Sequence, residues 1–443
     1  MRLNLNLLKA TITGALGGLL FGFDTVVISG VIDALVRLYN LSDYGKGWTV
    51  AIALIGTVVG SFGAGVVGQK LGGRETLRIT AVLYVISAIG SALAWNWPSL
   101  MVFRFLGGLG IGASSVLGPV YIAELAPAKI RGRLVGTFQI NVVVGILVAY
   151  ASNYGIRLLH LGSAEWRWQV GVAAIPALAF LVLLFRIPRS PRWSVSRARI
   201  DEALEVLKSM GAPDPDAELK DIRDALAQEH ATAHEPVFKW KYRYPLFLAI
   251  TIGAFNQLAG INAILYYLSN IFTSAGFTQI SSDMQSIAIG ATNLIFTLVG
   301  MSAIDKLGRK TLLLIGAVGT SGCLAGVAWV FHTQTHQSAL LWLLVTYIAF
   351  FALSQGAVIW VYIGEVFPNA VRSKGQGVGN ASHWIMNTAI ALEFPVLAGR
   401  LGTATPFVFF AIMTVVQFFV VLFTYPETKG QTLEALQRRL VRD

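Results

Sequence analysis

Long apolar runs, separated by short polar segments, make up most of the chain. A helix that spans a membrane needs about 20 mostly apolar residues, and twelve runs of that kind occur here. They cover residues 8–30, 47–69, 77–95, 100–122, 133–153, 168–187, 244–268, 284–303, 312–332, 338–362, 374–396 and 404–424. The pattern predicts an all-α membrane protein with twelve transmembrane helices.

A polar stretch at 198–236 separates the sixth run from the seventh. It contains DEALEVLKSM and DAELKDIRDALAQE, which combine helical apolar periodicity with helical acid-to-base spacing. We therefore expect short amphipathic helices on the membrane surface. The predicted organisation is an N-terminal six-helix bundle at 1–190, an intracellular helical linker at 191–243, a C-terminal six-helix bundle at 244–427 and a cytoplasmic tail at 428–443.

Three motifs recur in the same order in the two halves. The pairs are ELAPAKIR at 124–131 with EVFPNAVR at 365–372, QKLGGR at 69–74 with DKLGRK at 305–310, and PRSPR at 188–192 with PETKG at 426–430. Their offsets are all close to 240 residues. Parallel repeats with a central site near the membrane midplane are a known plan of transporters, so we expect two pseudo-symmetric bundles.

Composition and charge agree with a membrane location. Of the 443 residues, 55% are hydrophobic and 13% are charged, which excludes a soluble globular protein. The net charge of +11 is spread over short clusters between apolar runs, which indicates membrane topology rather than a nucleic-acid partner. With both termini in the cytoplasm, the outside loops hold only five of the 34 Lys and Arg residues, namely Arg37, Lys46, Arg157, Arg167 and Arg400. This asymmetry favours a bacterial inner membrane protein with both termini cytoplasmic.

Two charged residues lie inside apolar runs, Asp24 in the first and Arg104 in the fourth. A charge at the centre of a span costs about 2.5–3.5 kcal/mol, so we expect these two residues to pair. Two interpretations are open. The pair either fixes helix packing, or it is a proton switch in which Asp24 takes up a proton when it is separated from Arg104.

Polar amides inside the apolar runs are candidates for binding a neutral, hydroxyl-rich solute, because an amide offers donors and acceptors without adding charge. They are Gln139, Asn256, Gln257, Asn262, Asn293 and Asn387. Helix–helix hydrogen bonding is the alternative role for each of them. Gly253 and Gly260 flank the amides of the seventh run, and we expect both to let that helix bend.

Aromatic rings near the amides suit a sugar, whose C–H faces stack on rings. Trp360, Trp384, Tyr266 and Tyr267 are the candidates, and anchoring at the membrane interface is their alternative role. His383 is either a substrate contact or a hydrogen-bonded packing residue. We expect no metal site around it, because no other histidine is near it in the sequence.

Charged residues repeat at the predicted cytoplasmic helix ends. Arg74, Glu124 and Arg131 in the first half match Arg309, Glu365 and Arg372 in the second. They either set the topology or latch the inner mouth shut through charge pairs, and the repeated Glu-to-Arg spacing favours the latch. The lone Cys323 forms no intrachain disulfide, and the chain has neither a GxxxxGK[ST] phosphate loop nor a clustered catalytic set, so we expect no bound cofactor and no enzyme.

The chain resembles the sugar porter family of the major facilitator superfamily over essentially its whole length. GGLLFGFDTVVISG is similar to the first helix of that family, RFLGGLGIGASSVLGPVYIAELAPAKIRG to the fourth and NQLAGINAILYY to the seventh. DKLGRK, WVYIGEVFPNAVRSKGQG and PETKGQTLE also resemble family motifs. The resemblance implies the major facilitator fold, alternating access and a monosaccharide substrate, with glucose and xylose as the first candidates.

The resemblance also implies roles for single residues. Gln139, Gln257, Asn262, Asn293, Trp360 and Asn387 match positions that bind the hexose, and Tyr266 and Tyr267 match an extracellular gate. Asp24 matches the acid of proton-coupled members, where facilitative animal glucose transporters carry Asn, and Arg104 matches its partner. We therefore expect proton symport by a monomer. A facilitative uniporter is the alternative, and a non-transporting sugar sensor is a remote one because those proteins carry long cytoplasmic tails.

The sequence departs from the family pattern at four places. Asn256 replaces the usual first Gln of the pair, and His383 stands where Gln or Asn is common. GQKLGGRE lacks the usual acid and one arginine, at Gln69 and Gly73, and Arg189 stands where the family has Glu. With one acid fewer and one base more, we expect a weaker latch in the first half.

Overall fold

The computed structural model describes residues 4–127, 130–232, 235–368, 371–431 and 433–441. All regular elements in these residues are helical, as the apolar pattern predicts. The α-helices are α1 (Leu5–Tyr39), α2 (Asp43–Leu71), α3 (Gly73–Ala92), α4 (Trp97–Leu125), α5 (Arg131–Arg157), α6 (Glu165–Gly171), α7 (Ala174–Leu183), α8 (Pro191–Ser196), α9 (Ile200–Met210), α10 (Pro215–Thr232), α11 (Arg243–Leu258), α12 (Ile261–Tyr266), α13 (Leu268–Ser274), α14 (Gln279–Leu307), α15 (Arg309–Thr333), α16 (Ala339–Phe351), α17 (Ala357–Glu365), α18 (Arg372–Leu401), α19 (Thr405–Thr424) and α20 (Leu433–Leu440).

Eleven helical segments among the described residues are long and apolar enough to cross a membrane. These eleven segments match eleven of the twelve expected runs. The remaining expected run, 374–396, lies within α18. With 30 residues α18 is long enough to cross. Its polar side chains lower its hydropathy, and two of them, His383 and Asn387, are buried against neighbouring helices. The twelve expected spans are thus all present as helices.

The seventh predicted span is broken at one of the two glycines that flank its amides. Gly260 adopts a left-handed conformation with φ of 85°, and α11 ends two residues before it. The freed carbonyl of Ala259 accepts a hydrogen bond of 2.7 Å from the Tyr347 hydroxyl. At Gly253 the helix continues without a break, so the interruption of this span is at Gly260. Gly253 lies within α11, where a Cβ would be only 2.6 Å from the Gly379 carbonyl oxygen of α18, and it serves close helix packing.

The chain forms two compact units. Unit 1 contains the chain up to Val27 and from Ile52 to the end of α10, and unit 2 contains Ile28–Ala51 and the chain from Glu235 onward. One end of α1 and the beginning of α2 therefore pack with the second half of the sequence, although the repeat places both helices in the first half.

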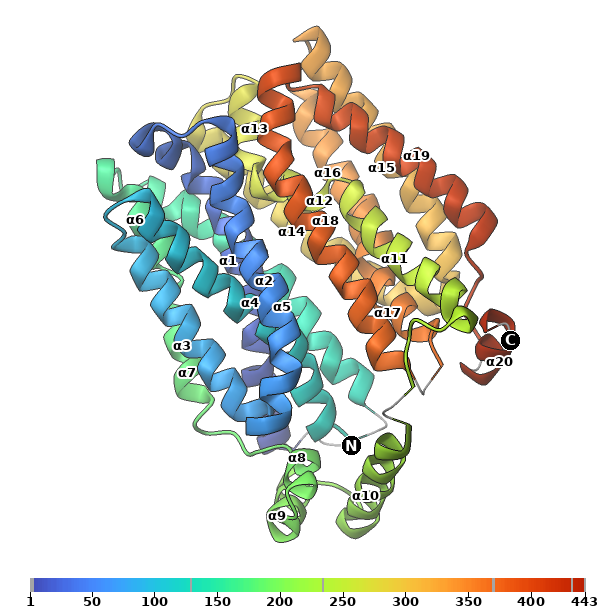
Figure 1. Cartoon of the computed structure of the whole chain (residues 1–443). Helices are drawn as coiled ribbons and strands as arrows, with labels where there is room; N and C mark the ends of the chain where they lie inside the picture. Colours follow the sequence, from blue (N-terminus) through green and yellow to red (C-terminus); the bar gives the residue numbers. More distant parts are fainter. Residues whose placement is uncertain (1–3, 128–129, 233–234, 369–370, 432, 442–443) are drawn as a thin grey trace. The chain divides into compact units, whose positions relative to one another are not determined.

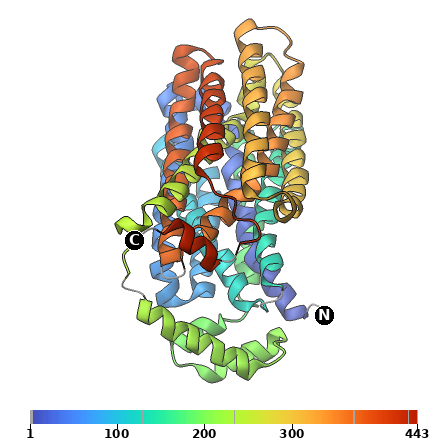
Figure 2. The same ribbon diagram turned by 90° about the vertical axis from the view of Figure 1, so that its right-hand side faces the viewer.

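Unit 1 is built around apolar side chains of α1, α3, α4, α5 and α7. Fully buried residues such as Tyr121 and Phe180 lie in this core. The linker helices α8, α9 and α10 form a separate layer at one end of the unit, and Val206 and Met210 of α9 pack against the core (Figures 1 and 2). The polar stretch is therefore helical, as predicted, and docks on unit 1.

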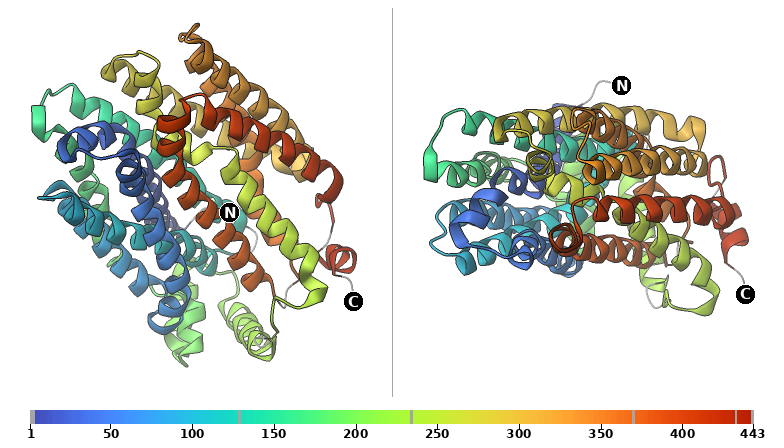
Figure 3. Two further views of the ribbon diagram at one scale, coloured as in Figure 1. Left: turned by 45° about the horizontal axis from the view of Figure 1, so that its top comes forward. Right: turned by 90° about the horizontal axis from the view of Figure 1, so that it is seen from above.

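Unit 2 has a second core, in which Ile252, Val358, Ile359 and Tyr362 are buried. Helix α11 packs along α18, and α15 packs along both α16 and α19. Figure 3 shows α15 and α19 as neighbouring orange and red ribbons. A π-helical turn at Ala352–Gly356 separates α16 from α17 and buries Gln355.

Candidate functional site

The Asp24 side chain in the middle of α1 has an unusual environment for a membrane helix. Its Oδ2 oxygen is buried and, among the described residues, has no hydrogen-bond partner. Helix α4 lies beside it, because a Cβ added at Gly107 would be 3.5 Å from this oxygen. Arg104, one turn earlier on α4, is 3% exposed, and its charge acts on the Asp24 carboxyl. The structure thus places both expected partners in unit 1, on the neighbouring helices α1 and α4.

In unit 2 the expected sugar-binding amides gather around Gln257. Its Nε2 donates to Asn256 Oδ1 over 3.0 Å, and its Oε1 accepts from Asn262 Nδ2 over 3.0 Å. The same Nε2 lies 3.2 Å from Nε2 of His383 on α18. Because an amide nitrogen only donates, this ring nitrogen accepts. Asn256 and His383, the two departures from the family pattern within the spans, therefore both contact one glutamine.

The break at Gly260 explains how the amides of one span converge. Gln257 is in the last turn of α11 and Asn262 is in the first turn of α12, five residues away. On a straight helix these side chains would point in different directions. The left-handed Gly260 turns the second helix so that the two side chains meet. A side chain at Gly260 would strike the Phe410 ring, so glycine is required there.

Aromatic rings surround His383 as well. Its ring centre lies 5.0 Å from that of Trp360 on α17 and 5.1 Å from that of its neighbour Trp384. Trp384 is 3% exposed, whereas Trp360 is 41% exposed. The amides and rings expected to bind sugar are therefore adjacent in unit 2, with Trp360 on the accessible side.

Asn387 links this cluster to the expected gate. Its side-chain amide nitrogen donates to the Tyr266 hydroxyl over 2.9 Å. Tyr267 donates to the Ala391 carbonyl over 2.8 Å, and its ring stacks on Phe394 with centres 5.2 Å apart. Both tyrosines are buried, with exposures of 1% and 0%. α12 and the first residue after it are thus fastened to α18 at three successive turns of that helix.

Two further expected binding residues lie on α14 and α5. Asn293 on α14 is buried, and within the described residues its side chain is hydrogen-bonded to Thr297 one turn along the same helix. Gln139 is half-buried on α5 of unit 1.

Two of the three expected latch residues of unit 2, Arg309 and Glu365, belong to one charge cluster. Arg309, at the first position of α15, contacts Glu365 at 2.8 Å and Asp305 at 3.0 Å. Glu427 accepts from the backbone N–H groups of Arg309 and Lys310 over 2.9 and 3.0 Å, and so caps α15. Arg372 instead donates to the Phe367 carbonyl over 3.2 Å.

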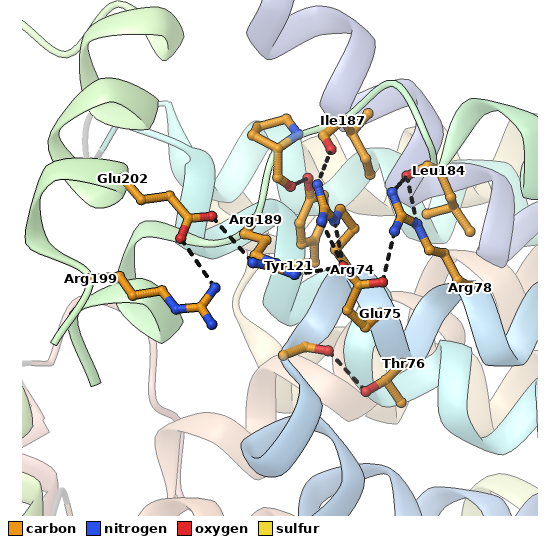
Figure 4. A network of polar contacts seen from close by, with 12 residues as sticks. Arg74, Glu75, Thr76, Arg78, Tyr121, Leu184, Ile187, Arg189, Arg199 and Glu202 are labelled. Carbon is orange, nitrogen blue, oxygen red and sulfur yellow. Dashed lines mark hydrogen bonds and ion pairs between the residues drawn. The ribbon is translucent and has the colours of Figure 1, made fainter. Parts of the chain in front are cut away.

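The corresponding cluster of unit 1 centres on an acid that the sequence analysis missed. Figure 4 shows Glu75 between Arg74 and Arg78, at 2.6 and 2.8 Å, with Arg189 at 3.5 Å. Glu202 of α9 lies 3.7 Å from the other side of Arg189. Glu75 thus supplies an acid to this cluster, which still holds more bases than acids, and the expected weaker latch in the first half stays a prediction. Glu75 directly follows Arg74 and lies in the first turn of α3, where an acid is favoured by the helix dipole.

Two further latch candidates lie near this end of unit 1. Glu124 is in the last turn of α4, and Arg131 begins α5 and points its Nε toward the Ala126 carbonyl at 3.5 Å. This contact is long, and it is confined to the α4–α5 connection.

Comparison with known proteins identifies the family. The model of the family described as "Sugar (and other) transporter" matches residues 10–440. The chain belongs to this family. It is 34% identical over 96% of its length to a D-xylose-proton symporter from Escherichia coli, covering 94% of that protein. It is also 34% identical to a glucose transport protein from Synechocystis, with 95% of each chain covered.

A solved structure gives the same result for the fold. The partially occluded inward open conformation of the xylose transporter XylE from E. coli matches with a TM-score of 0.87 at 32% identity, over 96% of this chain and 99% of that one. Both the major facilitator fold and the transporter class predicted from the motifs are therefore confirmed, and the protein is a multi-pass membrane transporter rather than an enzyme.

Proposed function

We propose that the protein carries a monosaccharide across the bacterial cytoplasmic membrane together with a proton, by alternating access. Proton coupling rests on the buried Asp24 oxygen, which has no hydrogen-bond partner in the described part of the chain and lies within reach of the Arg104 charge. A carboxylate in that position is held by Arg104 when the two are close. If a conformational change weakens this interaction, the low-dielectric surroundings favour the protonated acid.

The cluster around Gln257 supports a sugar as the substrate. Amides of Asn256, Gln257 and Asn262 already hydrogen-bond one another, so they can exchange these bonds for sugar hydroxyls without exposing a charge. The partly exposed Trp360 suits stacking on the C–H face of a pyranose. The hydrogen bond of Asn387 to Tyr266 would couple binding of the sugar to the position of the gate.

The relatives support the same substrate class, since they include a xylose-proton symporter and a glucose transport protein. The distribution of Lys and Arg supports placing both termini and the linker helices in the cytoplasm. The charge clusters around Glu75 and Arg309 then lie at the cytoplasmic side, where they latch the inner mouth shut. The transporter acts as a monomer.

Uptake into liposomes tests this proposal. We expect an inward proton gradient to drive accumulation of labelled xylose or glucose by the wild type. A membrane potential of 100 mV is worth about 2.3 kcal/mol per charge, enough for roughly fifty-fold accumulation. Asp24→Asn should equilibrate the sugar without accumulating it. If the wild type itself only equilibrates sugar, the protein is a facilitative uniporter, and if neither sugar moves, the substrate class is wrong.

A further inference from the structure

A single amide on α13 joins an acid of α1 to a base of α2. Asn270 Nδ2 donates to Asp33 Oδ1 over 2.9 Å, and Lys46 Nζ donates to Asn270 Oδ1 over 2.8 Å. Only this orientation of the amide satisfies both neighbours, because a carboxylate accepts and an ammonium donates. All three residues belong to unit 2.

The preceding residue makes a second connection. The Ser269 backbone N–H donates to Ser29 Oγ of α1 over 3.0 Å, and its hydroxyl donates to Asp283 of α14 over 2.9 Å. Asp283 and Ser29 are each 2% exposed. Two consecutive residues of α13 thus tie it to α1, α2 and α14.

This network adjoins the expected gate. The Lys46 ammonium lies 5.7 Å from the centre of the Tyr267 ring, and both residues line a cavity of about 180 Å³ together with Asn270 and Phe394. The backbones are also close, since a side chain at Gly47 would strike the Leu392 carbonyl of α18. The beginning of α2 is therefore packed tightly against α18 and against the segment that carries the two tyrosines.

We propose that Asp33, Asn270 and Lys46 form a clamp that stabilises the outward-closed state of the transporter. The proposal rests on the transport function proposed above. When the clamp is closed, the amide bridges both charges, and when it is open, water solvates them. A partly opened clamp has neither partner nor water for its half-buried charges, which is costly. The chemistry of the three residues therefore favours two discrete states, closed and fully open.

The sequence gives little sign of this clamp. Lys46 is one of the few basic residues assigned to the outside loops, and Asp33 and Asn270 lie in or beside apolar runs without a repeated motif. Asn270 is 224 positions from Lys46 and 237 positions from Asp33 in the sequence, so only packing brings the three residues together.

Labelling of a buried cysteine measures the open population. Cys323→Ser removes the native thiol, and Ser29→Cys places a thiol under the clamp. A membrane-impermeant maleimide is then applied from outside to this background and to the same background with Asn270→Ala. We expect labelling about tenfold faster with Asn270→Ala, because hydrogen bonds to charged groups are the stronger class. Thr273→Ala, which removes only a bond within α13, is the matched control and should leave the rate unchanged.

A double variant separates the clamp from a general loosening of the protein. Lys46→Gln should accelerate labelling as well, and Asn270→Ala/Lys46→Gln should be no faster than Asn270→Ala alone, because both changes remove one network. Three outcomes would each overturn the clamp proposal. They are an unchanged labelling rate in Asn270→Ala, an equal rise of the rate in Thr273→Ala, and additive effects on the rate in the double variant. Labelling needs no sugar, so a wild type that moves no sugar but responds to Asn270→Ala retains the clamp and refutes only the transport proposal.

Discussion

Each unit has a charge cluster at a helix junction, around Glu75 at the start of α3 in unit 1 and around Arg309 at the start of α15 in unit 2. Both clusters combine acids and bases, but acid and base stand at opposite positions of the repeated motifs. In unit 2 the base Arg309 is on the helix and pairs with Glu365, and the acid Glu427, from the chain segment that follows α19, accepts from the Arg309 backbone N–H. In unit 1 the acid is on the helix, at Glu75, and the base Arg189 reaches it from the segment that follows α7. Gly73 and Arg189 stand at the positions that match Arg309 and Glu427 in the repeated motifs.

This comparison shows that the charge balance of a junction belongs to the whole cluster rather than to single motif positions. A loss of charge at one position can be compensated by a neighbour one residue away, provided that its side chain reaches the same partners. The two clusters nevertheless differ in the length and the burial of their ion pairs. Arg309 is 9% exposed and makes close contacts to two acids, whereas Arg189 lies 3.5 and 3.7 Å from its acids with 29% of its side chain exposed.

The largest effect is expected from removing Arg309. Arg309→Ala leaves Glu365 without its buried partner, which costs about 3 kcal/mol, whereas Arg189→Ala should cost less than about 1 kcal/mol because that pair is long and solvated. Thermal unfolding of the detergent-solubilised protein measures both. Equal losses of thermal stability in the two variants would contradict the expected difference in strength between the ion pairs of the two clusters.

A smaller effect tests the exchange of positions in unit 1. Glu75→Gln leaves Arg74, Arg78 and Arg189 facing one another, and we expect a loss of about 1–2 kcal/mol in thermal stability. Adding Arg189→Glu should restore roughly half of it, because the acid then stands at the position that Glu427 occupies in unit 2. Arg186→Glu in the same Glu75→Gln background is the matched control, since Arg186 is exposed in the same segment. If both second changes restore stability equally, net charge and not position is responsible.

The smallest effect concerns the acid side of the pH range. Burial raises the pKa of the Glu427 carboxyl, but backbone N–H donors of Lys429, Arg309, Lys310 and Thr428 lower it more, so the pKa lies below its ordinary 4.5. The stability from this group is therefore fully present above about pH 4.5 and is lost as the pH falls through the lowered pKa.

Unfolding temperatures measured from pH 7 downward check this sign. The wild type should lose its advantage over Glu427→Gln as the pH falls, by less than about 1 kcal/mol because Glu427 is partly exposed to solvent. An advantage of the wild type that grows toward low pH would mean that the N–H donors do not stabilise the charged carboxylate.

Much of the architecture could be predicted because it depends on local composition. The apolar runs are each long enough to span a bilayer, and the repeated motifs reveal two related halves without any knowledge of contacts. Asp24 and Arg104 stand out because a charge in an apolar run is costly wherever the helix packs. The run at 374–396 was recognised as a span despite its polar residues, and it forms α18.

Other features were decided only by the tertiary structure. The contacts that decide the site depend on which helix faces meet. They include the break at Gly260, the contact of Gln257 with His383, the ion pairs of Glu75 and the bridge through Asn270. A sequence specifies the apolar length of a helix directly, since lipid acts as a uniform solvent along it. A polar contact between distant residues also needs a particular rotation and distance of two helices, and these follow from packing of the whole unit.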